Sequence, residues 1–302
     1  MNGNYYSLSE YLKERFGEKI YKISLDLGLT CPNRDGTLDT RGCIFCLEGS
    51  SHFAADEGSI PEKIEKAKEL IRKKTDARRF IAYFQSYTNT YAPTDYLEKI
   101  FSSVIQREDI AAISIGTRPD CLPEDIVKML TRLNKIKPVW VEIGLQTANE
   151  STAKYIRRYY ENHVYTDAVR RLSNHCIDVI THIIIGLPGE DMTDVLNSVD
   201  LAVSAGTKGI KLQLLHVLRG TDLARDYEAG KFNTLSLDEY IDILCECLPR
   251  IPKDVVIHRL TGDAPKAHLI APAWSADKKT VMNSIARELK SRGILQGSAT
   301  KN

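Results

Sequence analysis

Three thiols within one short stretch form the densest group of reactive side chains in this 302-residue chain. Cys31, Cys43 and Cys46 lie in the sequence CPNRDGTLDTRGCIFC, and the last two form a Cys-x-x-Cys pair. The Pro, Asn, Asp and Gly residues between them favour turns over helix or strand. We therefore expect these thiols to lie on a loop that wraps around a metal.

The thiols alone are consistent with several kinds of site. Structural zinc takes four Cys or His ligands, and His52 is close enough in sequence to be the fourth. A disulfide with one spare thiol and a thioredoxin-type redox pair are two further interpretations. Iron-sulfur centres normally have four Cys ligands, so a cluster held by three thiolates would leave one iron open to another molecule. The rest of the chain has to decide between them.

Composition limits the class of protein. A hydrophobic fraction of 43% and a charged fraction of 27% are ordinary for a globular chain with one large α/β domain or two small ones. The net charge of +1 argues against non-specific binding to polyanions. Seven cysteines with uneven spacing do not resemble a disulfide framework. With no apolar run of about 20 residues and no secretory pattern at the start, we expect a cytoplasmic protein that does not enter membranes.

Strand and helix patterns alternate along the chain. Residues 20–29 alternate apolar and polar side chains, which predicts a strand leading directly into Cys31. Five further strands, each followed by a helical pattern, are predicted at 79–85, 111–116, 139–145, 178–185 and 209–216. Such alternation implies right-handed βαβ units around a parallel sheet, and six units are too few for an eight-fold barrel. We predict an α/β fold, a partial (β/α)6 TIM-like barrel.

We expect three segments in this architecture. Residues 1–20 are a helical lead-in, residues 21–222 form the partial barrel, and residues 223–302 are a C-terminal α/β extension that packs on it. The extension contains a helix at 237–248, a possible seventh strand at 255–258 and a closing helix at 278–292. In barrels of this kind the reactive groups lie at the C-terminal ends of the strands, where the Cys loop also lies.

Three separated stretches together resemble the radical S-adenosylmethionine enzymes. They are the Cys loop, the strand that ends in GLQ at residues 144–146, and THIIIGLPGE at residues 181–190. The long gap before Cys43 resembles the YhcC/YtqA-type branch, which is related to the radical domain of the Elongator catalytic subunit. Further stretches that match the branch are TRPD at 117–120, LHVLRGT at 215–221, HRL at 258–260 and APAW at 271–274.

The resemblance implies a cluster and a cofactor. Cys31, Cys43 and Cys46 would hold a [4Fe-4S] cluster whose fourth iron is chelated by the methionine amino and carboxylate groups of S-adenosyl-L-methionine. One electron from the reduced cluster would cleave the cofactor, and the resulting 5′-deoxyadenosyl radical would take a hydrogen from the substrate. The enzyme would need an electron donor such as flavodoxin or ferredoxin.

Seven further residues are cofactor contacts by the same resemblance. The ribose and methionine portions would meet Thr117, Arg118 and Gln146, while Gln85 would meet the amino group, Arg158 the carboxylate, His182 the ribose and Ile184 the adenine. Guanidinium suits a carboxylate because it can donate two parallel hydrogen bonds. Where the family usually has Asn-Arg-Gly/Ala-His, this chain has Arg157-Arg158-Tyr159-Tyr160, which changes one wall of the site. An ordinary alternative for each strand-end polar group is the capping of a neighbouring helix.

Candidate substrate contacts come from the strands themselves. Glu142 lies among apolar neighbours, and a buried carboxylate needs a partner or a role in chemistry. Lys211 and His216 lie on or just beyond another strand, and an ion pair of Glu142 with Lys211 or Arg118 is equally compatible with the pattern. We assign Glu142, Lys211 and His216 as the catalytic candidates.

Kinship to the Elongator subunit indicates tRNA as the substrate class. The expected reaction is remodelling of a carboxymethylaminomethyl group on the wobble uridine, with bases stacking on Tyr87, Tyr91, Tyr159 or Tyr160 and arginine pairs meeting phosphates. Two alternatives remain. One is a radical enzyme that acts on a small metabolite, and the other is a non-catalytic, metal-stabilised binding protein with a fourth ligand such as His52.

Overall fold

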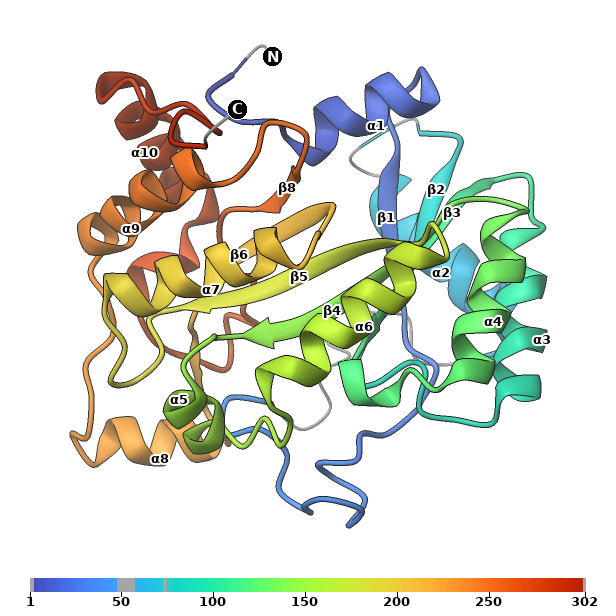
Figure 1. Ribbon diagram of the computed structural model, residues 1–302, viewed down its shortest axis with the longest axis horizontal. Helices are drawn as coiled ribbons and strands as arrows, with labels where there is room; N and C mark the ends of the chain where they lie inside the picture. Colours follow the sequence, from blue (N-terminus) through green and yellow to red (C-terminus); the bar gives the residue numbers. More distant parts are fainter. Residues whose placement is uncertain (1–2, 48–57, 73–74, 76, 301–302) are drawn as a thin grey trace.

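A computed structural model describes residues 3–47, 58–72, 75 and 77–300. Its main feature is a sheet of seven parallel strands in the order β1-β2-β3-β4-β5-β6-β8. The strands are β1 (Tyr21–Leu25), β2 (Phe80–Phe84), β3 (Ile110–Thr117), β4 (Val139–Gln146), β5 (Asp178–Ile185), β6 (Gly209–Leu214) and β8 (Val256–Arg259). The sheet curls into a half-barrel with helices around its outer face (Figure 1). The predicted α/β fold is confirmed, and the possible seventh strand extends the same sheet.

Amphipathic helices form the outer layer because each presents one apolar stripe to the sheet. In α4 (Glu124–Asn134), for example, Ile126, Val127, Leu130 and Leu133 are buried at helical spacing. The other helices of this layer are α2 (Ile60–Arg72), α3 (Thr94–Ile105), α6 (Asn162–Asn174) and α7 (Met192–Ser204), with α9 (Leu237–Arg250) on α7 and α10 (Lys278–Ser291) on α9. Among the described residues, no helix has the length and apolar character that a membrane crossing requires.

Helix α1 (Leu8–Phe16) closes the N-terminal end of the half-barrel. Leu12 and Ile20 pack with inward side chains of the strands, and the Tyr11 ring lies 5.9 Å from that of Trp140. The backbone N–H of Ile257 in β8 donates to the Tyr6 carbonyl at 2.8 Å, which joins this segment to the last strand. The first and last described segments lie close together at the end of the molecule opposite the Cys loop (Figure 1), where the Gln296 N–H donates to the Asn4 carbonyl at 2.9 Å.

The C-terminal end of the half-barrel has its own small apolar cluster. Ile44 of the Cys loop packs there with Ile184, Leu187 and Leu223. Two short helices, α5 (Glu150–Tyr155) and α8 (Asp222–Glu228), lie on the same side as the Cys loop (Figure 1). A two-stranded antiparallel ribbon of β7 (Val217–Leu218) and β9 (Leu269–Ala271) completes this end.

Two strands end at least two residues before their predicted C-terminal ends. β1 ends at Leu25 because the Asp26 carboxylate accepts the Gly28 N–H at 2.7 Å and Gly28 has a positive φ of 68°, which together turn the chain. β6 ends at Leu214, so His216 lies beyond this strand, in the short connection between β6 and β7. Past β1 the alternation continues through Leu27 and Leu29, which is why it overestimates that strand, whereas past β6 it is already broken by the apolar pair Leu214 and Leu215.

Candidate functional site

One cavity of about 980 Å³ runs along the inner face of the sheet and is lined both by the Cys loop and by side chains from strands β1 to β8. Eleven of the thirteen predicted site residues line it, namely Cys31, Cys43, Cys46, Gln85, Thr117, Arg118, Glu142, Gln146, Arg158, His182 and Lys211. The fold therefore brings most of the predicted site residues to one cavity.

The three thiols are free and lie at the wall of this cavity. None of the seven cysteines forms a disulfide, so the disulfide interpretation is not supported. The Asn33 amide donates to Cys43 Sγ at 3.3 Å and to the Arg157 carbonyl at 2.8 Å. Burial raises the pKa of the Cys43 thiol to about 12 and also raises the pKa of the Cys46 thiol. Metal binding at such thiols therefore has to release protons.

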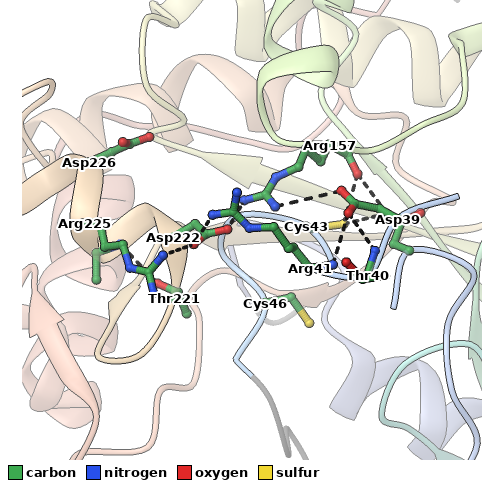
Figure 2. Close-up of polar contacts among 12 residues, drawn as sticks. Asp39, Thr40, Arg41, Cys43, Cys46, Arg157, Thr221, Asp222, Arg225 and Asp226 are labelled. Carbon is green, nitrogen blue, oxygen red and sulfur yellow. Dashed lines mark hydrogen bonds and ion pairs between the residues drawn. The ribbon is translucent and has the colours of Figure 1, made fainter. Parts of the chain in front are cut away.

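A charged cluster holds the Cys loop against α8. Figure 2 shows Arg41 and Arg157 meeting the Asp222 carboxylate, which Arg225 also contacts at 3.1 Å. The Arg41–Asp222 distance is 2.7 Å, and the Leu223 N–H donates to the Ile44 carbonyl at 2.9 Å. Although burial opposes it, hydrogen bonds from Arg157 and Arg41 hold the pKa of Asp222 below its usual value. We call Arg41, Arg157 and Asp222 the loop clamp.

A single metal ion needs ligands that converge on one point. In the described part of the chain, no three His, Cys, Asp or Glu side chains are grouped in that way. His52, the predicted fourth zinc ligand, lies outside the described residues. In a [4Fe-4S] cluster, by contrast, each thiolate binds its own iron.

The strand ends next to the Cys loop carry polar side chains with defined partners. Thr117 Oγ1 lies 2.5 Å from Thr90 Oγ1, and the Arg118 guanidinium binds Asp120 through two hydrogen bonds of 2.9 and 2.7 Å. Although burial opposes it, the bonds to Asp120 raise the pKa of Arg118. Arg118 also lies 4.9 Å from the Tyr160 ring. It pairs with Asp120 and not with Glu142, so of the two alternative partners proposed for Glu142, Lys211 or Arg118, the second is wrong.

Gln146 leaves β4 through a left-handed turn with φ of 66°. A Cβ on Gly144 would lie 2.3 Å from Gln146 Nε2, so only glycine lets the Gln146 side chain fold back over the strand. The Tyr160 hydroxyl donates to the Gly144 carbonyl at 2.5 Å. The GLQ sequence and the Tyr160 that distinguishes this chain thus form one wall of the cavity.

Arg158 is only 1% exposed and all five of its N–H groups have partners. Its guanidinium donates to the carbonyls of Leu145, Thr147 and Tyr160 and to the side chains of Glu150 and Asn162. A cofactor carboxylate would have to displace one of these partners. The role of Arg158 as a carboxylate ligand therefore stays a prediction.

Glu142 is the centre of a buried polar network further inside the half-barrel. Its side chain is 0% exposed and accepts from Lys22 at 2.6 Å, Ser114 at 2.6 Å, His182 at 2.8 Å and Lys211. Although burial opposes it, the two lysines hold the pKa of Glu142 well below its usual value. The predicted pair with Lys211 is confirmed.

Two predicted site residues do not line the cavity. The Ile184 side chain belongs to the apolar cluster around Ile44. His216 packs on Gly262, where a Cβ would lie 2.3 Å from His216 Cε1, and its buried Nε2 has no partner among the described residues. Burial lowers the pKa of His216 to about 4. The structure thus separates His216 from Glu142 and Lys211, the other two catalytic candidates.

Sequence reasoning missed Lys22, Tyr83, Ser114 and Asn33, all of which contact these groups. Lys22, Tyr83 and Ser114 lie on strands, at positions whose side chains point to the inner face of the sheet. The alternation of side chains along each strand could therefore have identified these three residues. Asn33 lies in an irregular loop, where no periodicity signals its direction.

Comparison with known proteins agrees with this architecture. The Radical SAM superfamily matches residues 40–202, and the Radical_SAM C-terminal domain matches residues 207–291. The protein YtqA of Bacillus subtilis is 42% identical over 97% of this chain and 92% of its own length. The chain belongs to the radical S-adenosylmethionine superfamily, whose members are enzymes that use a [4Fe-4S] cluster and S-adenosylmethionine.

Two more distant similarities concern the Elongator kinship. The solved structure of archaeal Methanocaldococcus infernus Elp3 has a TM-score of 0.69 at 15% identity and covers 92% of this chain and 64% of that one, which shows a shared fold. The tRNA uridine(34) acetyltransferase of Methanocaldococcus jannaschii is 24% identical over 53% of this chain. This chain spans only 29% of that acetyltransferase.

The residues at the Cys loop fit the cofactors of the family. Three free thiols with no fourth cysteine beside them in the sequence provide the donor set of a cluster with one open iron. Three buried polar atoms, Asn33 Oδ1, Ser86 Oγ and Thr88 Oγ1, have no partner among the described residues, and all three residues line the cavity. Buried polar groups are rarely left unpaired, so these atoms are suited to a polar ligand.

Proposed function

We propose that this protein is a radical S-adenosylmethionine enzyme that modifies the wobble-uridine side chain of tRNA, by remodelling its carboxymethylaminomethyl group. The observation that carries the enzymatic part is the cavity, where three free thiols share one wall with Gln85, Thr117 and Gln146. The tRNA part is supported by similarity to a protein named tRNA uridine(34) acetyltransferase.

In this proposal Cys31, Cys43 and Cys46 hold the cluster, and the polar strand ends hold the cofactor. When bound, the cofactor supplies a 5′-deoxyadenosyl radical that abstracts a hydrogen atom from the substrate. The chain's own part is to orient these groups and exclude water. Asn33 donates a hydrogen bond to Cys43 Sγ, a contact of the kind that tunes the reduction potential of a cluster. A small electron carrier such as flavodoxin or ferredoxin supplies the electron.

The aromatic residues expected to stack on RNA bases differ in exposure. Tyr159 is 46% exposed, whereas Tyr87 and Tyr91 are half-buried and the Tyr160 ring lies inside the cavity wall against Arg118 and Arg158. Arg158 is buried, so it cannot meet a phosphate at the surface. We therefore assign base stacking at the surface to Tyr159, with Tyr87 and Tyr91 deeper.

The experiment incubates the anaerobically reconstituted protein with S-adenosylmethionine, a reductant and tRNA that carries carboxymethylaminomethyluridine. Mass spectrometry of the digested tRNA should show that this nucleoside is lost, and 5′-deoxyadenosine should form at the same time. A Cys43→Ala variant is the matched inactive control.

If 5′-deoxyadenosine forms at the same rate with and without this tRNA and the nucleoside is unchanged, the tRNA proposal is wrong. A radical enzyme that acts on a small metabolite is then favoured.

A further inference from the structure

The inner part of the cavity holds more positive than negative charge. Lys22 and Lys211 both pair with the single carboxylate of Glu142. Lys22 binds Oε1 and Lys211 binds Oε2. Their side chains are 18% and 7% exposed, and both residues line the cavity. One carboxylate can neutralise only one ammonium group, so one positive charge is in excess.

The other charged groups around this point do not remove the excess. Arg259 at the end of β8 lies 2.8 Å from Asp263, and these two charges cancel. His182 of β5 and His258 of β8 are uncharged at neutral pH because burial lowers the pKa of His182 to about 4 and that of His258 further below its usual value. Tyr83 of β2 is neutral because burial raises its pKa. Within the described residues the group therefore carries a net charge of one positive unit whenever both lysines are protonated, which is the state below about pH 7 because burial lowers the pKa of Lys211 to about 7.

Glu142 has no free lone pair for chemistry. Each of its two oxygens accepts two hydrogen bonds, from Lys22 and Ser114 on one and from His182 and Lys211 on the other. A carboxylate has about four acceptor positions, and all are used. Glu142 therefore positions the lysines and does not act as a base.

The lysines are also held by an aromatic ring, and further polar atoms face the same space. Lys22 Nζ lies 4.9 Å and Lys211 Nζ lies 4.7 Å from the centre of the Tyr83 ring. Gln213 and His258 line the cavity, and their buried Oε1 and Nδ1 atoms have no partner in the described part of the chain. A buried excess charge is costly unless an anion meets it, and the unpaired Gln213 Oε1, which can only accept, is costly unless an N–H or O–H of the ligand donates to it.

We propose that Lys22 and Lys211 form a subsite for a carboxylate group of the substrate, with Glu142 as the positioning residue. A carboxylate matches one excess positive charge, whereas a phosphate monoester carries about −1.5 to −2 at neutral pH. The inference rests on the proposed function in one respect, the identity of the molecule that carries the carboxylate. In that function the carboxylate is the end of the carboxymethylaminomethyl substituent.

Binding should also depend on pH. Burial lowers the pKa of Lys211 to about 7, and a carboxylate beside it would favour the charged ammonium. Above pH 7, ligand binding should therefore take up a proton, which isothermal titration calorimetry detects as a heat that depends on the buffer.

The test measures the binding of 5-carboxymethylaminomethyluridine and of 5-aminomethyluridine, which lacks the carboxylate, to the reconstituted protein. We expect at least about tenfold tighter binding of the first, and loss of this preference in Lys22→Met. With tRNA as substrate, Lys22→Met should raise KM at least about tenfold with little change in kcat. Lys128→Met is the control, because Lys128 is 61% exposed and pairs only with Glu124 on α4. Lys22→Gln, which keeps a hydrogen-bond donor without the charge, replaces Lys22→Met if that variant does not fold.

Three results would overturn the subsite. In the first, the two nucleosides bind equally well. In the second, the Lys22 variants keep the preference for the nucleoside that carries the carboxylate. In the third, inorganic phosphate competes with that nucleoside as strongly as acetate does. Failure of the tRNA proposal looks different: the tRNA is not modified, but acetate and the carboxylate nucleoside still bind in a manner that depends on Lys22.

Discussion

Buried charged side chains in the cavity wall are held by partners that fix their position. Arg158 illustrates this, because its five N–H groups bind the end of β4 and the turns before α5 and α6 at the same time. A guanidinium can do this because its donors lie in one rigid plane. The residue therefore connects the strand that carries Gln146 to the helices that follow it.

Replacing Arg158 by Lys should destabilise the fold. An ammonium group offers three donors and no plane, so at least two of the five acceptors lose their partner, and because only Glu150 is well exposed, at least one of these two is shielded from water. We expect a loss of about 2 kcal/mol or more in the free energy of unfolding, measured by urea denaturation. Arg170→Lys on the exposed face of α6 is the control and should change stability by less than about 0.5 kcal/mol. Unchanged stability with a loss of cofactor affinity would instead favour the role that the family resemblance gives Arg158.

Glu190 should make stability depend on pH. It follows β5 in the GLPGE turn, where burial raises its pKa from 4.5 to about 7, and its Oε2 has no partner among the described residues. The folded protein thus holds a proton that the unfolded chain releases, and stability falls as pH rises from about 4.5 to 7. Glu190→Gln should raise the unfolding temperature at pH 8 and change it little at pH 5. The opposite order, with the larger effect at pH 5, would show that the carboxylate is stabilised as an anion.

Glu142 shows what a residue pattern can and cannot predict. A carboxylate in an apolar strand correctly indicated a buried group with a partner, and Lys211 was among the candidates. The strand pattern could not reveal that Lys22 and Ser114 take the other lone pairs, because they come from β1 and β3. Ser114 lies beside Glu142 because β3 pairs directly with β4, whereas the curvature of the sheet brings Lys22 of the more distant β1 to the same carboxylate.

At the scale of elements, the Cys loop is held by contacts far away in sequence. Arg157 follows α5 and Asp222 begins α8, and both bind the loop that contains Arg41. The loop has no helix or strand of its own, and these ion pairs add to hydrogen bonds such as that from the Asn33 amide to the Arg157 carbonyl at 2.8 Å. A loop fixed before the cluster binds loses less entropy on binding.

Asp222→Asn should weaken the loop clamp. The amide cannot pair with Arg41 and Arg157 as an anion does, so residues 31–46 should exchange backbone hydrogens faster in the iron-free protein. Iron retained after reconstitution should also fall. Asp226→Asn on the same helix is the matched control, because Asp226 contacts Lys231 and Tyr155 and not the Cys loop. Equal exchange rates in the two variants would contradict a restraining role for Asp222.

Element boundaries could be predicted where side-chain periodicity carries the signal. The strand predicted at residues 178–185 agrees with β5 at both ends: Asp178 begins an apolar-rich segment, and Gly186, with a positive φ of 92°, ends it. The paths of the Cys loop and of the His216 turn could not be predicted, since ion pairs and close packing on Gly262 determine them. The side chain of Ile184, expected at the adenine of the cofactor, packs with Ile44 next to Cys43, and its cofactor role stays a prediction.

At the scale of the whole molecule, one cavity connects two different environments. Thiols and strand-end polar groups surround one part, and a buried lysine-glutamate network surrounds the other. α1 closes the N-terminal end with Leu12 and Trp140 in an apolar layer. The half-barrel thus offers space for a cofactor beside the Cys loop and for a substrate group further inside.

In the proposed enzyme, three thiolates hold a cluster whose open iron binds the cofactor. Anaerobic reconstitution with iron and sulfide, followed by electron paramagnetic resonance of the reduced protein with and without S-adenosylmethionine, tests it most directly. We predict about four equivalents of iron and a [4Fe-4S] signal that changes when the cofactor is added. The signal should be absent when Cys31, Cys43 and Cys46 are all replaced by Ala. One retained zinc ion with no bound iron, or a cluster signal that the cofactor leaves unchanged, would contradict the account.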